Sequence, residues 1–332
     1  MRIGLSYDLK DDIKPGVAED DLEEYDSQET VKLLADSLAA GGNRVVMLGG
    51  GWDFLDNIQW HKVDIVFNIA EGRGNHRSRE AQVPAVLEML DIPYTGSDVL
   101  CLATCLDKPL AKKLVALEGI ATPRWLLIDD EKDLGATAWQ AFTFPVIVKP
   151  AHEGSSKGIR LTSVVENEIQ AHEEAARILG HYHQPVMVEE FIDGDEVTVG
   201  LLGNSPPDVL GMMLILPRII NGRFVYSLEV KRDYENLVEY QCPAPLDGGL
   251  RESLRLASLK VFQALGCRDF ARIDFRIGQD GRPYFIEINP LPGLGRHSDL
   301  VIMALKLGWT HEKLVGAILN TALKRQPRCI TA

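Results

Sequence analysis

Three oxygen-bearing side chains near the end of the sequence have the spacing of paired strands. Asp274 follows Arg272 by two positions and Asn289 follows Glu287 by two, so each pair shares one face of a strand. The intervening Asp280-Gly281 sequence is typical of a hairpin turn that would place the pairs opposite each other. Two carboxylates and an amide oxygen suit Mg²⁺. The spacing predicts a magnesium site beside an arginine, with a solvated sheet face as the alternative.

A lysine and a loop of small residues form a second candidate site. The apolar segment 145–149 ends in Lys149, and Gly154-Ser155-Ser156 follows five residues later. Small residues let backbone N–H groups approach an anion closely, and a lysine adds positive charge. The GxxxxGK[ST] pattern of a Walker A motif is absent. The segment predicts a phosphate-binding loop, although an ordinary hairpin would have a similar sequence.

The segment 185–192 is a third candidate, because an apolar strand there runs into an acidic, glycine-containing turn. Exposed backbone groups at such a turn could bind the edge of a purine, and Glu196 could accept hydrogen bonds from ribose hydroxyls. Taken alone, the segment is only a strand with acidic ends.

Composition excludes several classes of protein. At about 150 residues per domain, 332 residues suggest about two domains. The net charge of −13 makes nucleic acid an unfavourable partner. No segment approaches the roughly 20 apolar residues that span a bilayer, and the N-terminus lacks a signal sequence. The five cysteines have no zinc-site spacing; Cys101 and Cys105, on one predicted helix face, are interpreted as small core residues. We expect a cytoplasmic protein without a membrane partner.

The elements that position these residues follow from periodicity. The first third alternates between strands and helices, which predicts an α/β unit with an open, doubly wound parallel sheet. Its expected strands are 2–7, 44–48 and 63–69, and its expected helices are 27–40, with Ser27 as N-cap, and 81–90. The acidic run 18–26 is interpreted as a solvated face.

After residue 98 the pattern changes to short strands interrupted by helices. The expected strands are 124–128, 145–149, 159–162, 185–191, 196–202, 209–216, 223–231, 271–277 and 283–288. The expected helices are 106–118, 166–179, 249–265 and 300–323.

Four segments occur in an order that resembles the ATP-grasp superfamily, and most closely D-alanine–D-alanine ligase and its homologues. They are FPVIVKPAHEGSSKGI, VMVEEFIDGDEVTV, ARIDFRI and FIEINPLPGLGRHSD. The segments IPYTGSD and CLDKPLAKKLVALEGIATP are also similar to that family, so the match covers nearly all of the chain after about Val63. The resemblance implies a three-lobed ATP-grasp fold, α/β overall and α+β in the ATP-grasp lobes. Its parts are a doubly wound pre-ATP-grasp domain (1–103), a central subdomain (104–195) and a C-terminal subdomain with the metal and substrate site (196–332).

The resemblance also implies a reaction, in which ATP phosphorylates a carboxylate and an amine attacks the acyl phosphate to give an amide, ADP and phosphate. Small amino-acid-like molecules would be the substrates, and a homodimer is common in the family. ATP phosphates would contact Lys108, Lys149, Gly154, Ser155 and Ser156, and adenosine would contact Glu189, Glu190, Ile192 and Glu196. Two Mg²⁺ ions, which Mn²⁺ could replace, would be bound by Asp274, Glu287 and Asn289. The implied catalytic residues are Arg272 with the Gly293 N–H as an oxyanion hole, Lys231 at the γ-phosphate, and Ser155.

The sequence departs from the resembled family around the substrates. The stretch 4–10 lacks the family's glutamate for the first substrate's ammonium, and Glu71 replaces its histidine. Arg232 replaces a tyrosine after Lys231, and Asp299 replaces an apolar residue after Ser298, which is retained for the second substrate's carboxylate. Glu71 could pair with an amino group. Arg73, Arg77 and Arg79 could pair with a carboxylate or be loop-surface charges.

These departures favour a ligase for amino-acid-like substrates other than D-alanine. A genuine D-alanine–D-alanine ligase of peptidoglycan synthesis is the first alternative. The others are an ATP-binding protein without ligase activity, and an enzyme that carboxylates or phosphorylates a small acid.

Overall fold

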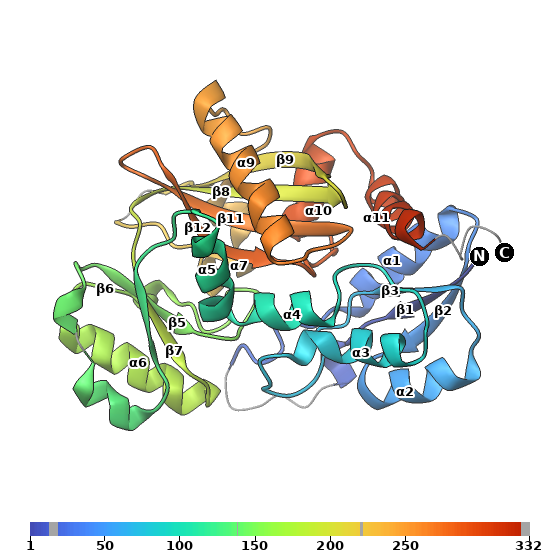
Figure 1. The fold of residues 1–332 in the computed structure, drawn as a ribbon, viewed down its shortest axis with the longest axis horizontal. Helices are drawn as coiled ribbons and strands as arrows, with labels where there is room; N and C mark the ends of the chain where they lie inside the picture. Colours follow the sequence, from blue (N-terminus) through green and yellow to red (C-terminus); the bar gives the residue numbers. More distant parts are fainter. Residues whose placement is uncertain (13–18, 138, 220–221, 327–332) are drawn as a thin grey trace.

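Three sheets, one in each lobe, organise the chain (Figure 1). The computed structural model describes residues 1–12, 19–137, 139–219 and 222–326. Short 3-10 helices join the larger elements at Lys10–Asp12, Arg79–Ala81, Glu131–Ala136, Trp139–Ala141 and Leu161–Ser163.

The N-terminal lobe contains a parallel sheet, as predicted, and its strand order is β2-β1-β3. Ile65 and Phe67 of β3 pack in a core with α1 and α11, whereas Val66 packs in a second core with α2 and α3, so helices cover both faces. Ser27 caps α1 by accepting a hydrogen bond from the N–H of Thr30. The elements are β1 (Arg2–Ser6), α1 (Gln28–Ala40), β2 (Arg44–Gly49), α2 (Gly51–Trp60), which the sequence analysis did not predict, β3 (Ile65–Asn68) and α3 (Gln82–Met89).

The central lobe is an antiparallel sheet, β4-β7-β5-β6, with α6 packed on one face. The predicted strand 159–162 is wrong, because the Arg160 N–H donates to the Ser163 hydroxyl and closes a 3-10 turn. The elements are β4 (Trp125–Ile128), β5 (Val146–Pro150), β6 (Val164–Val165), α6 (Glu168–Tyr182) and β7 (Val186–Glu190).

The C-terminal lobe is a five-stranded antiparallel sheet in the order β10-β9-β8-β11-β12. Figure 1 shows α9 crossing one face, where α4 and α5 add to the same apolar core, while α10 lies against the opposite face. The elements are α4 (Val99–Leu106), α5 (Lys108–Leu117), β8 (Gly194–Gly203), β9 (Pro207–Pro217), β10 (Val238–Gln241), α9 (Gly248–Ala264), β11 (Phe270–Gly278), β12 (Pro283–Asn289), α10 (Asp299–Lys306) and α11 (His311–Arg325).

Local capping divides or replaces three predicted elements. The predicted strand 223–231 is wrong: the Ser227 hydroxyl accepts from the N–H of Val230 and begins the short helix α7 (Leu228–Arg232), which α8 (Tyr234–Leu237) follows. Asp107 caps α5 and separates it from α4 within the predicted helix 106–118. Gly308, with φ 79°, ends α10 and divides the predicted helix 300–323.

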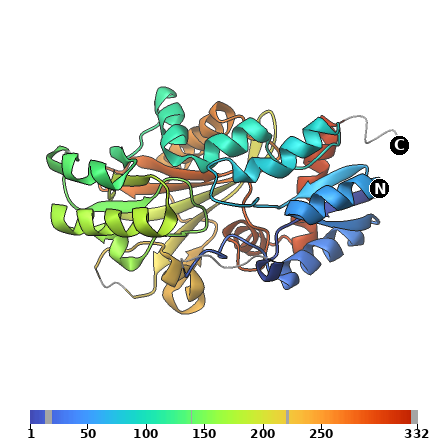
Figure 2. The ribbon, with the colours of Figure 1, turned by 90° about the horizontal axis from the view of Figure 1, so that it is seen from below.

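The last helix returns to the first lobe, so the N-terminal and C-terminal segments share a core. Figure 2 shows α11 beside the N-terminal sheet, and the Ser37 hydroxyl lies 2.8 Å from Nδ1 of His311. The boundaries at residues 103 and 195 remain predictions. No helix within the described ranges is long and apolar enough to span a membrane.

Candidate active site

The predicted hairpin forms between β11 and β12 and brings the proposed metal ligands together. Asp274 pairs with Glu287 and Arg272 pairs with Asn289 across the two strands. An Arg272 nitrogen lies 3.0 Å from Asp274 Oδ2 and 3.9 Å from Glu287 Oε1. Two carboxylates and an amide therefore lie on the face of the sheet opposite α9. This oxygen donor set fits Mg²⁺, which takes few protein oxygens and completes its shell with phosphate and water.

Positive charge around the hairpin keeps Glu287 ionised. Burial opposes ionisation, but the charges of Lys108, Lys149 and Arg272 outweigh it and hold the pKa of Glu287 far below its ordinary value. Lys108 Nζ lies 3.2 Å from Glu287 Oε2. Burial raises the pKa of Asp274, and Arg272 offsets part of that effect.

Two lysines converge on one buried glutamate in the wall of a cavity between the central and C-terminal sheets, the predicted nucleotide cavity. Glu189 Oε2 lies 2.6 Å from Lys149 Nζ, and its Oε1 accepts a 2.6 Å hydrogen bond from Lys112 Nζ. Burial lowers the pKa of Lys112 to about 8, although the Glu189 charge opposes this. Sequence reasoning missed Lys112; the signal was its position one helical turn after Lys108. Glu189, predicted to bind adenosine, has its carboxylate engaged by the two lysines.

The cavity predicted for adenosine lies between the central and C-terminal sheets. Its lining includes Glu190, Ile192 and Glu196, as expected, together with Phe191 and Arg276, which were not predicted. The Arg276 guanidinium stacks 4.5 Å from the centre of the Phe191 ring and lies 3.4 Å from the Glu196 carboxylate. Burial raises the pKa of Glu196 to about 7, and Arg276 opposes that rise. The remaining apolar lining includes Ile147, Ile159, Val225 and Ile286.

The predicted phosphate loop is held by the acidic segment that precedes α1. The N–H of Gly154 donates to Glu24 Oε1 at 2.6 Å, and the N–H of Gly158 donates to Asp20 Oδ2 at 2.8 Å. The interpretation of 18–26 as a solvated face is therefore wrong for Asp20 and Glu24, which are buried; residue 18 lies outside the described ranges. Ser155 and Ser156 adopt left-handed backbone conformations with φ of 49° and 60°. The N–H of Gly154, predicted to contact phosphate, is therefore occupied by a carboxylate of the chain, and phosphate binding by this loop remains a prediction.

A second cavity, of about 440 Å³, opens where the three lobes meet. Glu71, Ser155, Asn289, Gly293 and Ser298, all predicted as site residues, are in its lining. A Cβ added at Gly293 would lie 2.9 Å from the Ser298 hydroxyl, so a side chain there would force the hydroxyl to move. Four residues line both this cavity and the nucleotide cavity, namely Tyr226, Lys231, Arg272 and Asp299.

Carboxylates crowd the N-terminal wall of this second cavity. Burial raises the pKa of Glu71 well above its ordinary value, and the nearby charges of Glu80, Glu24 and Asp26 raise it further. Burial, reinforced by Asp8, raises the pKa of Asp26 to about 7. A cationic group on a substrate would stabilise the ionised forms of these carboxylates.

The three loop arginines are occupied by carboxylates of the chain. Arg79 is buried and lies 2.6 Å from Glu24 and 3.0 Å from Glu153. Arg73 pairs with Asp8, and the more exposed Arg77 pairs with Asp107.

The helix α7 contributes Leu228, Lys231 and Arg232 to the lining of the second cavity. Arg232 extends from it to Glu19 at 2.7 Å and to Glu23 at 2.6 Å, which ties the helix to the acidic segment. Lys231 points inward, with Nζ 5.1 Å from the centre of the Tyr226 ring. Burial and the Arg272 charge lower the pKa of Lys231.

Comparison with known proteins agrees with this geometry. The family model described as D-ala D-ala ligase C-terminus matches residues 114–320. The D-alanine–D-alanine ligase of Aquifex aeolicus is 35% identical over 294 residues, covering 89% of this chain and 94% of the relative.

Solved structures show the same fold. The D-alanine–D-alanine ligase of Bacillus anthracis complexed with ATP superposes with a TM-score of 0.77, at 24% identity and 99% coverage of both chains. The VanG D-Ala:D-Ser ligase of Enterococcus faecalis superposes with a TM-score of 0.74, at 21% identity, covering 97% of this chain and 99% of that one. The fold is therefore the ATP-grasp fold that the sequence motifs predicted. From the family model and the relatives together, the chain belongs to the D-alanine–D-alanine ligase family of ATP-dependent, ADP-forming carboxylate–amine ligases.

Proposed function

We propose that the two adjoining cavities carry out the two halves of one ligation. ATP in the first cavity phosphorylates the carboxylate of an amino acid in the second, and the amine of another amino acid then displaces phosphate to form the amide. The supporting observation is that Lys231 and Arg272 line both cavities. A phosphate and a carboxylate repel each other, so bringing them together requires positive charge at their meeting point.

Each predicted site residue has a role in this proposal. Asp274, Glu287 and Asn289 would hold two Mg²⁺ ions, with Mn²⁺ able to replace them. When bound, these ions neutralise charge on the phosphates. Arg272 and the Gly293 N–H would stabilise the oxyanion of the tetrahedral intermediate. The ATP phosphates would be bound by Lys108, Lys149, Gly154, Ser155 and Ser156, and adenosine by Glu190, Ile192 and Glu196.

Glu189 has a different role in this proposal from the one that the resemblance implied. Because both of its oxygens are engaged by lysines, it would position Lys149 for the phosphates while Lys112 neutralises it. This arrangement keeps Lys149 extended toward the cavity before ATP arrives.

The substrates in this proposal are amino acids that need not be D-alanine. The carboxylates of Glu71 and Asp26 favour an ammonium group in the N-terminal part of the cavity, and Ser298 would bind the second substrate's carboxylate. The support is the carboxylate-rich wall together with Asp299, which stands where the family has an apolar residue. A homodimer and a cytoplasmic location, where ATP and free amino acids are supplied, complete the proposal.

The test is a survey of phosphate release from Mg-ATP with D- and L-amino acids, singly and in pairs, with product masses. Release that requires a pair, with a product equal to the sum of the two minus water, supports the amide ligase and identifies its substrates. Release with no amide of any composition would contradict the proposal. Loss of the signal in Asp274→Ala would assign it to this site.

D-Alanine–D-alanine ligation for peptidoglycan synthesis is the second candidate. It is favoured by the 35% identity to a ligase of that name over nearly the whole chain. Activity with D-alanine alone, at a kcat/KM above that of every other pair, would select it over the broader proposal.

A further inference from the structure

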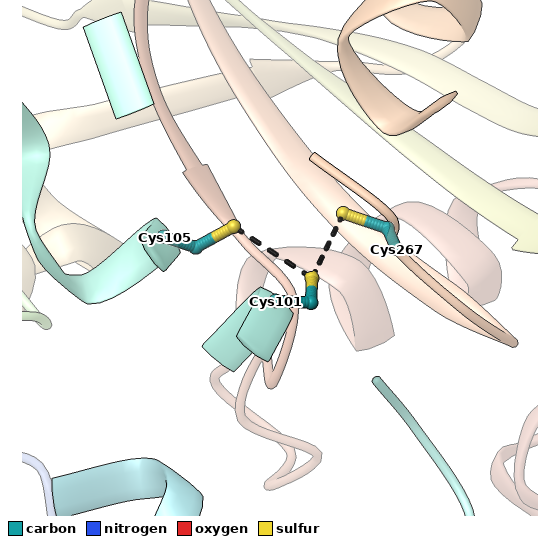
Figure 3. A group of neighbouring side chains, drawn as sticks. All are labelled: Cys101, Cys105 and Cys267. Atoms are coloured by element: carbon teal, nitrogen blue, oxygen red, sulfur yellow. Dashed lines mark hydrogen bonds between the residues drawn. The ribbon is translucent and has the colours of Figure 1, made fainter. Parts of the chain in front are cut away.

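Three cysteines from distant parts of the sequence meet in the core on the side of the C-terminal sheet that α9 covers. Cys101 and Cys105 lie one turn apart on α4, and Cys267 lies in the turn between α9 and β11. Figure 3 shows the three sulfurs facing one another, with Cys101 Sγ 3.5 Å from Cys267 Sγ and 3.8 Å from Cys105 Sγ. All three sulfurs lie within 4.8 Å of one another.

This spacing is that of a three-sulfur metal site. With metal–sulfur bonds of about 2.3 Å, three ligands in a plane around one ion have sulfurs separated by about 4.0 Å. The Cys101–Cys267 and Cys101–Cys105 separations of 3.5 and 3.8 Å are close to that value, and the third pair of sulfurs lies within 4.8 Å. Small thiols that served only to fill the core would not need to point at one another from two elements 166 residues apart in sequence.

The backbone fixes the three ligands before any ion binds. The N–H of Cys101 donates to Asp98 Oδ1, the N-cap of α4, at 3.0 Å. The N–H of Cys267 donates to the carbonyl of Phe262 at 2.9 Å, after Gly266 turns the chain with φ of 69°. The thiols are 1%, 4% and 7% exposed in chain order, so water competes little for the ion.

The ligand set selects the class of ion. In the part of the chain that the structure describes, no histidine or carboxylate joins the group of three sulfurs. Structural Zn²⁺ sites are almost always four-coordinate, whereas soft thiolate ligands also select Cu(I). Cu(I) accepts three ligands, and the described residues offer no fourth ligand atom within the group, so the set suits Cu(I) better than Zn²⁺. We propose that Cys101, Cys105 and Cys267 form a trigonal, all-sulfur site for Cu(I).

An ion has a route to this site. Cys267 lines an outer cavity of about 570 Å³, bordered by Asn204 and Arg268. Binding exchanges thiol protons for the cation, and the protons leave to solvent.

The test uses the full chain with its other two cysteines removed. Cys242 does not belong to the group and Cys329 lies outside the described ranges, so Cys242→Ala/Cys329→Ala keeps only the three clustered thiols. The reduced protein is titrated anaerobically with Cu(I) against a chromophoric Cu(I) chelator. We expect one Cu(I) per chain, and X-ray absorption with three sulfurs at about 2.3 Å.

Two further variants separate ligation from packing. Adding Cys101→Ala should weaken Cu(I) binding by at least about 100-fold, following the loss of one of three ligands. Val261→Ala opens space in the same core without removing a sulfur and should leave the affinity unchanged. Unchanged affinity in Cys101→Ala, or fewer than three sulfurs in the absorption spectrum, would overturn the proposal. The spectrum needs no variant of the three ligands, so it decides the matter even if Cys101→Ala fails to fold.

Discussion

Asp299 Oδ2 lies 3.2 Å from a terminal nitrogen of Arg272, so the guanidinium at the junction of the two cavities is held by a carboxylate of the chain. Its other oxygen accepts a 3.0 Å hydrogen bond from the Tyr226 hydroxyl. Asp299 thus fixes the direction of Arg272 while lowering the net positive charge where the acyl phosphate would form.

Replacing Asp299 should misplace Arg272 rather than unfold the protein. We expect Asp299→Asn, which keeps the shape and loses the charge, to lower kcat by about 10²-fold because displacement of a positioning group by about 1 Å has that cost. Steady-state kinetics of phosphate release will measure this, with KM for ATP nearly constant. A kcat equal to that of the unaltered chain would mean that Asp299 does not position Arg272.

The proposed metal ligands on the β11–β12 hairpin give a second prediction. Asp274→Asn and Glu287→Gln should each lower kcat by about 10²–10³-fold, since each removes a charge that compensates an ion beside the phosphates. The apparent Mg²⁺ requirement should rise in the same assay. Asp280→Asn, at the exposed tip of the same hairpin, is the matched control and should retain full activity. If Asp280→Asn also lost activity, the losses would reflect disturbance of the hairpin and not removal of metal ligands.

Lys112 should be essential for stability. Its side chain is fully buried against Glu189, and removing one partner of a buried ion pair costs about 3–5 kcal/mol. Lys112→Met should therefore lower the free energy of unfolding by that amount in urea titration. Lys113→Met, exposed on the same helix, should change it little. If Lys112→Met and Lys113→Met have the same free energy of unfolding, the Lys112–Glu189 pair contributes less to stability than we infer.

The raised pKa of Asp26 predicts that the stability of the protein depends on pH. The pKa of Asp26 is raised to about 7 in the folded chain, mainly by burial, against about 3.9 when unfolded. Its contribution to stability is complete below about pH 4 and is lost as the pH rises to 7, a loss of up to about 4 kcal/mol. Asp26→Asn should therefore unfold at a higher urea concentration than the unaltered chain at pH 8 and close to it at pH 4.

The control for Asp26→Asn is Asp36→Asn, because Asp36 is exposed on α1. It should follow the unaltered chain at both pH values. Parallel curves for Asp26→Asn and the unaltered chain would refute the shifted pKa.

Breaking the contact between α7 and the acidic segment should uncouple phosphate release from amide formation. Arg232→Ala releases α7 from Glu19 and Glu23 on the surface, so stability should change little. Water would reach the acyl phosphate more often, and phosphate release per amide formed should rise. Arg255→Ala, which breaks a surface pair on α9, is the control. If both variants release one phosphate per amide formed, α7 does not keep water from the acyl phosphate.

Features of this protein that depend on local pattern could be predicted from the amino-acid sequence. Alternation along β11 and β12 and the turn between them placed Asp274 opposite Glu287, because the geometry of a hairpin follows from its strand period and turn. The order of the motifs likewise predicted the family and the three lobes. Capping residues such as Ser227 were visible in the sequence, but the short helix that Ser227 begins was missed because the flanking residues resemble a strand.

The pairing of charges that are distant in the sequence could not be predicted and depends on tertiary packing. The burial of Glu24 against Gly154 joins residues 130 apart, and the pairing of Lys112 with Glu189 joins residues 77 apart. Such contacts depend on how the lobes pack, for which a charged side chain in a sequence carries no local signal. The same reason applies to the three thiols, since Cys267 reaches Cys101 only when the C-terminal sheet packs against α4.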